Sequence, residues 1–359
     1  MPIYKNVSDL PMGAVLMPEL GIVPTDLQGI LLGLLAAANN RQEFSARLYQ
    51  KRLELILCKN ADGRGGEHFL LKWPDAYWDY RFDMPIFTWE LQKQLDDQIM
   101  VFAPEKFSEL SFATDVLHAM GCYFIMEGGS ANKLYDPRIC SFVFPELHGK
   151  RADYAAKALS LAIKKGVQTH YPQLPKEHLK QHTSRGLRVA TNLELALHPQ
   201  VTHDQRIYMG GWGHHKNGDG YLKSSPAMVM APALALAGRN NVSVKKENLP
   251  HTPTLSWLGS SASQSIGKFL NKICEVDVPQ LESSGNLRRL FEACIATLIM
   301  YHPLMKKKFG CNDRVCSKLE QVAESVGLKD LAFSEGTSPK EVLLGWGKCS
   351  SEGIYPKKC

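Results

Sequence analysis

The sequence predicts a mostly helical α+β protein with one small antiparallel sheet. Apolar residues recur at the three- and four-residue spacing of an amphipathic helix in most parts of the chain. Two short runs, residues 68–73 and 86–89, have instead the composition of β-strands, and a loop rich in aspartate, proline and aromatic residues separates them. The 359 residues are 44% hydrophobic and 22% charged, which is an ordinary composition for a globular protein with at least one sizeable core.

The expected elements follow from local signals taken in chain order. Pro24, Thr25 and Asp26 are helix-start signals directly before the apolar stretch LQGILLGLLAAA. Pro199 follows the helix predicted at residues 183–197 and ends it, because proline cannot continue a helix. Residues 210–220 contain five glycines in eleven residues, which predicts a loop. The predicted helices span residues 27–38, after the start signals at 24–26, and residues 42–58, 105–124, 151–165, 183–197, 264–273, 287–300 and 314–326.

Charge and cysteine content narrow the classes of function. The net charge of +6 and the pI of about 8.7 permit a nucleic-acid partner without demonstrating one. The nine cysteines include no CxxC pair, so free thiols in a reducing compartment are favoured over a zinc site. The apolar runs at 30–38 and 293–300 are too short to span a bilayer, and the first residues lack a secretory signal. An intracellular protein with no membrane partner is therefore expected.

Four short features occur in a fixed order along the chain. Taken singly, each has an ordinary explanation, such as a polar turn, a solvated basic helix face or a packed tyrosine. Their spacing is more specific, since Arg188 lies 24 residues before Trp212 and Trp212 lies 9 residues before Tyr221. The four features are Arg64-Gly-Gly-Glu67, Arg185-Gly-Leu-Arg188, Gly210-Gly211-Trp212 and Tyr221.

In this order and spacing, residues 40–230 resemble the tyrosine recombinase (phage-integrase-like) superfamily. The stretch from Thr183 to Arg188, together with Trp212, is most similar to the recombinases of Crypton-type eukaryotic mobile elements. The resemblance implies a tyrosine-recombinase catalytic domain over residues 41–235. Residues 1–40 would then be a vestigial or partial clamp region, and residues 236–359 a helical C-terminal extension.

The resemblance also implies partners and a cellular location. Double-stranded DNA is the expected substrate, and a homo-oligomer assembled on DNA is the expected active form. The expected location is the nucleus if the host is eukaryotic. Neither a cofactor nor a metal is expected.

The resemblance assigns Tyr221 as the nucleophile that attacks a phosphodiester and forms a 3′-phosphotyrosine. Negative charge develops on the non-bridging oxygens during this attack. The guanidinium groups of Arg64 and Arg188 can offer paired N–H donors to those oxygens, which a lysine cannot reproduce. Donors fixed where the charge develops stabilise the transition state by several kcal/mol in a dry site.

The remaining candidate residues support this reaction. Trp212 corresponds to the position whose ring N–H contacts the scissile phosphate. The leaving 5′-oxygen needs a proton, and Lys93 is the candidate general acid, with Lys72 as a second choice. Glu67 is expected to orient its surroundings. Arg185 is a further catalytic candidate, because it stands three residues before Arg188.

Two features depart from the family pattern. The family has His or Lys at the position of Arg185, and an arginine stays protonated, so it binds phosphate but accepts protons poorly. His182, one helical turn earlier, is expected at the surface. Only 63 residues precede Arg64, which leaves too little chain for a full clamp domain. The alternatives are therefore a catalytically inactive DNA-binding descendant, a type IB topoisomerase-like enzyme, and a helical protein in which the motifs coincide by chance.

Overall fold

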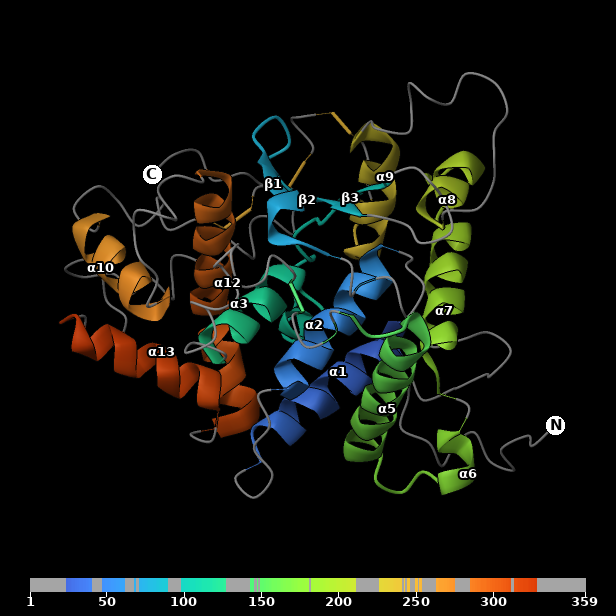
Figure 1. The fold of residues 1–359 in the computed structure, drawn as a ribbon, viewed down its shortest axis with the longest axis horizontal. Coiled ribbons are helices and arrows are strands. Elements are labelled where there is room, and N and C mark those ends of the chain that lie inside the picture. Colours follow the sequence, from blue (N-terminus) through green and yellow to red (C-terminus); the bar gives the residue numbers. More distant parts are fainter. Residues whose placement is uncertain are drawn as a thin grey trace.

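The structure is a computed structural model in which helices surround one small antiparallel sheet (Figure 1). This confirms the mostly helical α+β class. The structure describes residues 24–40, 47–61, 68, 71–89, 98–126, 143–144, 147, 149–180, 182–210, 226–240, 242, 244–245, 249–250, 252–253, 263–274, 285–310 and 313–327. The elements are α1 (Pro24–Ala38), α2 (Arg47–Asn60), η3 (Trp73–Asp75), β1 (Ala76–Asp79), β2 (Met84–Trp89), β3 (Gln98–Val101), η4 (Ser111–Ala113), α3 (Val116–Met126), α5 (Ala152–His170), α6 (Lys176–Leu179), α7 (Ser184–Leu197), α8 (His203–Met209), α9 (Pro226–Leu236), α10 (Ser263–Cys274), α12 (Gly285–Phe309) and α13 (Arg314–Ser325).

The sheet has the strand order β1-β2-β3, and both neighbouring pairs are antiparallel. Phe87 in β2 pairs with Ala76 of β1 on one side and with Met100 of β3 on the other. Asp83, in the turn between β1 and β2, has a positive φ of 53°, a conformation that aspartate tolerates better than most residues. The central strand is buried, so the sheet is part of the core.

The strand predicted at 86–89 is confirmed within β2, whereas the described residues of the run predicted at 68–73, which are 68 and 71–73, form no strand. Trp73 begins η3 instead. The physical reason is Pro74, which has no N–H to donate to a ladder and fixes φ at a value that suits a tight turn. Lys72 forms only an isolated β-bridge, and the first strand begins at Ala76.

Six of the predicted helices are confirmed as α1, α5, α7, α10, α12 and α13, with α5 and α12 longer than expected. Of the helix predicted at 42–58, residues 47–58 lie in α2 and residues 42–46 lie outside the described part. The short helices α6 and α8 and the strands β1 and β3 were not predicted, and β1 lies in the stretch that was predicted as a loop. None of these elements is long enough to show a clear period.

The helix predicted at 105–124 is wrong over its first eleven residues, of which only Ser111–Ala113 form a short 3₁₀ helix, η4. Backbone N–H groups there bond elsewhere: Lys106 N donates to Ala237 O at 2.8 Å, and Ser108 N donates to Ser111 Oγ at 2.9 Å. The helix α3 starts only after Asp115, whose carboxylate accepts from His118 N at 2.8 Å as an N-terminal cap. The apolar spacing of this stretch reflects burial in the core and not helical structure.

The helices α1 and α5 cross at two glycines that bring the backbones into contact. A Cβ added at Gly33 would lie 2.1 Å from Gly166 O, and a Cβ added at Gly166 would lie 2.4 Å from Ile30 O. Glycine inside a helix costs roughly 1 kcal/mol relative to alanine, so this close crossing offsets an intrinsic disadvantage. It places α5 firmly over α1.

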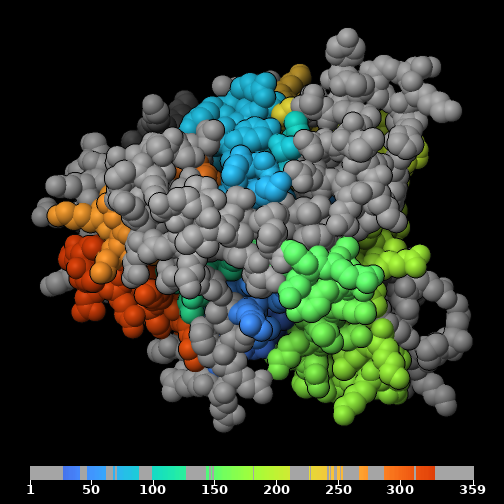
Figure 2. Space-filling view, in the orientation of Figure 1, coloured from blue at the N-terminus to red at the C-terminus, as the bar shows by residue number. Residues whose placement is uncertain are grey.

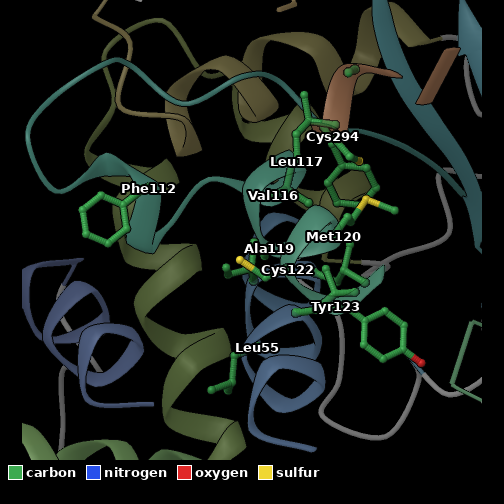
Figure 3. Close-up of a cluster of buried hydrophobic side chains, with 14 of the residues drawn as sticks. Leu55, Phe112, Val116, Leu117, Ala119, Met120, Cys122, Tyr123 and Cys294 are labelled. Atoms are coloured by element: carbon green, nitrogen blue, oxygen red, sulfur yellow. The ribbon is translucent and has the colours of Figure 1, made fainter. Parts of the chain in front are cut away.

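One hydrophobic core includes helices from both ends of the chain. Figure 3 shows buried side chains of α3 together with Leu55 of α2, Phe112 of η4 and Cys294 of α12. The rings of Phe124 in α3 and Phe291 in α12 stack at 4.4 Å. The predicted boundaries at 40/41 and 235/236 remain a prediction, and described helices on both sides of them share this core.

The hydrogen bonds around Asn39 join the end of α1 to the start of α13. Asn39 Nδ2 donates to Asp313 Oδ2 at 3.0 Å, and Tyr49 OH donates to Asn39 Oδ1 at 2.9 Å. Asp313 also caps α13 by accepting from Cys316 N at 2.7 Å.

Among the helices described here, none is long and apolar enough to cross a membrane.

The close crossing of α1 and α5 at Gly33 and Gly166 predicts the effect of Gly33→Ala. A methyl group has no room against the Gly166 carbonyl, so we expect the free energy of unfolding to fall by about 2–3 kcal/mol. Gly267→Ala in α10 is the matched control, because nothing lies within 4 Å of a Cβ added there. The control should stabilise the helix by up to about 1 kcal/mol. Urea denaturation measures both, and equal effects would contradict the close crossing.

Candidate active site

Two of the predicted site residues, Arg185 and Arg188, lie in α7 within the described part of the structure. The other candidates lie outside the described residues: Arg64, Glu67, Lys93, Trp212 and Tyr221. The structure does describe the chain on either side of each of these segments. The site is therefore built from the elements that hold the segments at their ends.

The helix α7 begins at a fixed position against α5. The Thr183 side chain caps the helix by accepting from Gly186 N at 3.3 Å, and Ser184 N donates to Ser160 Oγ of α5 at 3.0 Å. Leu187 and Leu195 are buried, so the rotation of α7 about its axis is set by its apolar face. Arg188 is then half-buried and Arg185 is exposed.

Arg188 connects α7 to the beginning of the glycine-rich segment. Its Nη2 donates a hydrogen bond to the carbonyl oxygen of Gly210, the residue that ends α8. Gly210 directly precedes Gly211 and Trp212 in the sequence. The contact therefore brings together two of the four features that the sequence analysis singled out. A guanidinium carries five N–H donors and can contact several acceptors at once.

Both ends of segment 211–225, which carries Trp212 and Tyr221, are held by packed helices. Before the segment, α8 starts at a capping box in which Thr202 and Gln205 bond reciprocally, at 2.9 and 3.2 Å. After it, α9 packs against α8, α7 and β3, with Val229 and Met230 fully buried. The span available to the segment is thus set by the core.

The chain before Arg64 is held by the last turn of α2. Lys59 Nζ donates to Leu236 O at the end of α9 at 2.6 Å and lies 3.8 Å from Glu194 Oε1 of α7. Three helices therefore meet at Lys59, and the chain leaves α2 at Ala61, which is itself buried. Sequence reasoning missed Lys59, since a lysine in a last helical turn is usually a solvated residue that favours the helix dipole.

The chain after Glu67 is held by a buried ion pair. His68 Nε2 lies 3.0 Å from Glu54 Oε2, and His68 Nδ1 lies 3.4 Å from Cys58 Sγ. Glu54 Oε1 also accepts from Lys51 Nζ and from Gln50 Nε2, each at 2.6 Å. Both His68 and Glu54 are inaccessible to solvent. The segment of Arg64 and Glu67 is thus fixed at both of its ends.

The pKa values of His68 and Glu54 shift in opposite directions from their ordinary values. Burial acts to lower the pKa of His68, but the neighbouring Cys58 and Glu54 outweigh it and raise the value to about 10. Burial acts to raise the pKa of Glu54, but His68 and Lys51 outweigh it and lower the value. Both groups are therefore charged at neutral pH, and each stabilises the charge of the other. A glutamate in the apolar stretch Leu53–Cys58 was the signal in the sequence that could have revealed the pair.

The expectation that His182 lies at the surface is wrong. Its exposed fraction is 4%, and its Nδ1 lies 3.0 Å from the carbonyl oxygen of His178. Burial lowers its pKa, so the ring is neutral at physiological pH. The physical reason is the compact turn between α6 and α7, which folds the ring inward.

The two lysines considered as general acids occupy different places. Lys72 is half-buried and immediately precedes η3. Lys93 lies in sequence between the end of β2 at Trp89 and the start of β3 at Gln98. The segment that contains Lys93 therefore connects two strands that pair with each other, and the role of Lys93 stays a prediction.

Within the described part of the chain, no group of three or more His, Cys, Asp or Glu residues is arranged to hold a metal ion. Comparison with protein-family models, with curated proteins and with solved structures finds no match to this chain.

The buried pair predicts the effect of Glu54→Gln. Removing one partner leaves the other charge buried without compensation, so we expect a loss of about 3 kcal/mol in the free energy of unfolding at neutral pH. Glu292→Gln is the matched control, because Glu292 pairs with Arg288 at 3.1 Å on the surface of α12. The control should cost no more than about 0.5 kcal/mol. Urea denaturation compares the two, and a similar small loss in both would refute the role of the pair.

The same pair predicts a pH dependence. The raised pKa of His68 makes its contribution complete below about pH 6.5 and lost as the pH rises toward about 10. The lowered pKa of Glu54 makes its contribution complete above pH 4.5 and lost as the pH falls through the folded value. The stability difference between the chain and Glu54→Gln should therefore be largest between these limits and shrink steadily in alkali. Urea titrations from about pH 5 to about pH 9.5 test this; a constant difference contradicts it.

Proposed function

We propose that this chain binds duplex DNA and cuts and rejoins it through a 3′-phosphotyrosine at Tyr221, as a tyrosine recombinase. The observation that carries the proposal is the hydrogen bond from Arg188 to Gly210. It joins the helix of the second arginine feature to the first residue of the segment that bears Trp212 and Tyr221. Phosphate-binding and nucleophilic groups must lie close together for this reaction, and the contact is consistent with that requirement.

The proposed chemistry balances without an external energy source. The Tyr221 hydroxyl oxygen attacks phosphorus and loses its proton to water, the bond to the 5′-oxygen breaks, and Lys93 protonates that oxygen. The phosphotyrosine conserves the energy of the broken bond, so the 5′-hydroxyl of a second strand can reverse the step. Arg64 and Arg188 would donate to the non-bridging oxygens, where negative charge develops. Trp212 would add its indole N–H.

The elements around the arginine features support this assignment. The first feature follows α2, and the three-stranded sheet follows the first feature, with Lys93 in the connection between β2 and β3. Lys59 holds α2 against α7, which carries the second feature, and against α9, which follows the nucleophile segment. These contacts favour a shared site, because they hold the neighbourhoods of the features in one part of the core.

A DNA-binding protein that no longer cleaves is the second candidate. The observation that favours it is Arg185, which is exposed on α7 and stands where the resemblance places His or Lys. An arginine there binds phosphate without accepting a proton. A type IB topoisomerase would use the same groups but would relax plasmids without sequence preference. Assembly as a homo-oligomer on DNA and location in the nucleus are further parts of the proposal.

A nicked duplex tests the reaction directly. Release of a short 5′-hydroxyl strand traps any covalent adduct, which denaturing electrophoresis detects. We expect an adduct with the chain and none with Tyr221→Phe. Arg188→Lys should lower the rate of adduct formation by about 100-fold, because it loses the paired donors.

Arg206→Lys is the matched control for this experiment, since Arg206 lies on α8 and contacts His203 at 3.1 Å. Its rate should stay within about twofold of the parent rate. An adduct that persists in Tyr221→Phe would refute the nucleophile. Salt-sensitive DNA binding with no adduct would select the inactive DNA-binding protein.

A further inference from the structure

Positive charge is concentrated in one stretch of the chain. Residues 150–188 contain nine Lys and Arg against two acidic residues, Asp153 and Glu177, a net charge of +7. The whole chain carries +6, so the remainder is close to neutral. Most of these nine are exposed, and Lys164 and Arg188 are half-buried. The nine are Lys150, Arg151, Lys157, Lys164, Lys165, Lys176, Lys180, Arg185 and Arg188.

The outer face of α5 presents part of this charge. Its inner face, with Leu159, Ile163 and Val167, is buried against the core. Lys157 and Lys164 are seven residues apart, which is two helical turns, so they lie on the same outer side. The side chain of Lys157 is 79% exposed. In Figure 2, residues of α5 and α6, drawn in green, lie on the surface of the molecule that faces the viewer.

The basic face of α5 is continuous with the start of α7. Ser160 of α5 accepts from Ser184 N, the first residue of α7, at 3.0 Å. Lys157 and Lys164 flank Ser160 by one helical turn on either side. Arg185 directly follows Ser184, and Arg188 lies one turn further along α7. The lysines of α5 and the arginines at the start of α7 therefore form one continuous basic surface.

We propose that this basic surface, formed by α5, α6 and the first turn of α7, binds the sugar-phosphate backbone of duplex DNA beside the scissile phosphate. The identification of DNA rests on the proposed function, while the surface itself follows from the charge and the packing. The 19 residues of α5 extend over about 28 Å, which corresponds to roughly eight base-pair steps. Backbone contacts of this kind position a duplex without reading its sequence.

An anionic membrane fits the surface less well. A helix that lies in a membrane interface needs a wide apolar face toward the lipid. The apolar face of α5 is already packed against α1 and α2, and only two large apolar side chains, Tyr154 and Leu161, are exposed outside, by 52% and 66%. Asp153 lies 3.2 Å from Arg151 and 3.9 Å from Lys157, but exposed pairs are weak and leave these cations able to exchange partners.

The test compares two double variants that each remove two positive charges. Lys157→Gln with Lys164→Gln alters the proposed surface, and Lys268→Gln with Lys272→Gln alters exposed lysines of α10. Fluorescence anisotropy measures the binding of a labelled duplex as salt is varied, using the full chain with Tyr221→Phe so that no covalent step contributes. We expect the α5 variant to bind about tenfold more weakly at about 0.1 M salt, with a salt slope shallower by about one to two. The α10 variant should change affinity by less than about twofold.

Each outcome decides the inference. Equal effects of the two double variants, or no duplex binding by the chain, overturn it. Weaker binding of the α5 variant to vesicles containing phosphatidylserine, with unchanged duplex binding, also overturns it and assigns the surface to membranes. The covalent adduct is a separate readout: selective loss of duplex binding in the α5 variant supports the surface even if Tyr221 forms no adduct. An adduct with no contribution from α5 leaves the proposed function standing without it.

Discussion

Charged side chains of α2 are buried in the core, and their need for partners holds the surrounding elements in place. Arg52 is inaccessible to solvent, and its guanidinium donates to the carbonyl oxygens of Phe112 and Ala113 before α3. Glu54 pairs with His68, and Lys59 bonds to the end of α9. A buried charge without a partner costs several kcal/mol, so each of these contacts restricts where its partner can lie.

The same contacts hold the described residues on either side of the predicted site segments. The chain enters the Arg64 segment from the last turn of α2 and leaves it at His68, and both points are tied to α2 side chains. Lys59 also approaches Glu194 of α7, the helix that carries Arg188. The Arg188 contact with Gly210 then extends this arrangement to the glycine-rich segment. The arginine features thus depend on a common support.

The charge distribution connects this support to the proposed partner. The net charge of +7 between residues 150 and 188 belongs to helices that pack through their apolar faces onto α1 and α2. Because those faces are buried, the lysines and arginines remain on the outside, where a polyanion can reach them. The core that packs against α7, which carries Arg185 and Arg188, also orients the basic surface of α5.

The amino-acid sequence alone determines the helices with a strong apolar period and the strand at 86–89, because each depends on neighbouring residues. It also determines the order of the arginine, tryptophan and tyrosine features. Packing alone decides the rest. It delays the start of the helix predicted at 105–124 to Val116, since Lys106 bonds to Ala237, and it buries His182, Glu54 and Lys59. A residue's burial depends on partners far away in the chain, such as Leu236 for Lys59, and no local spacing encodes them.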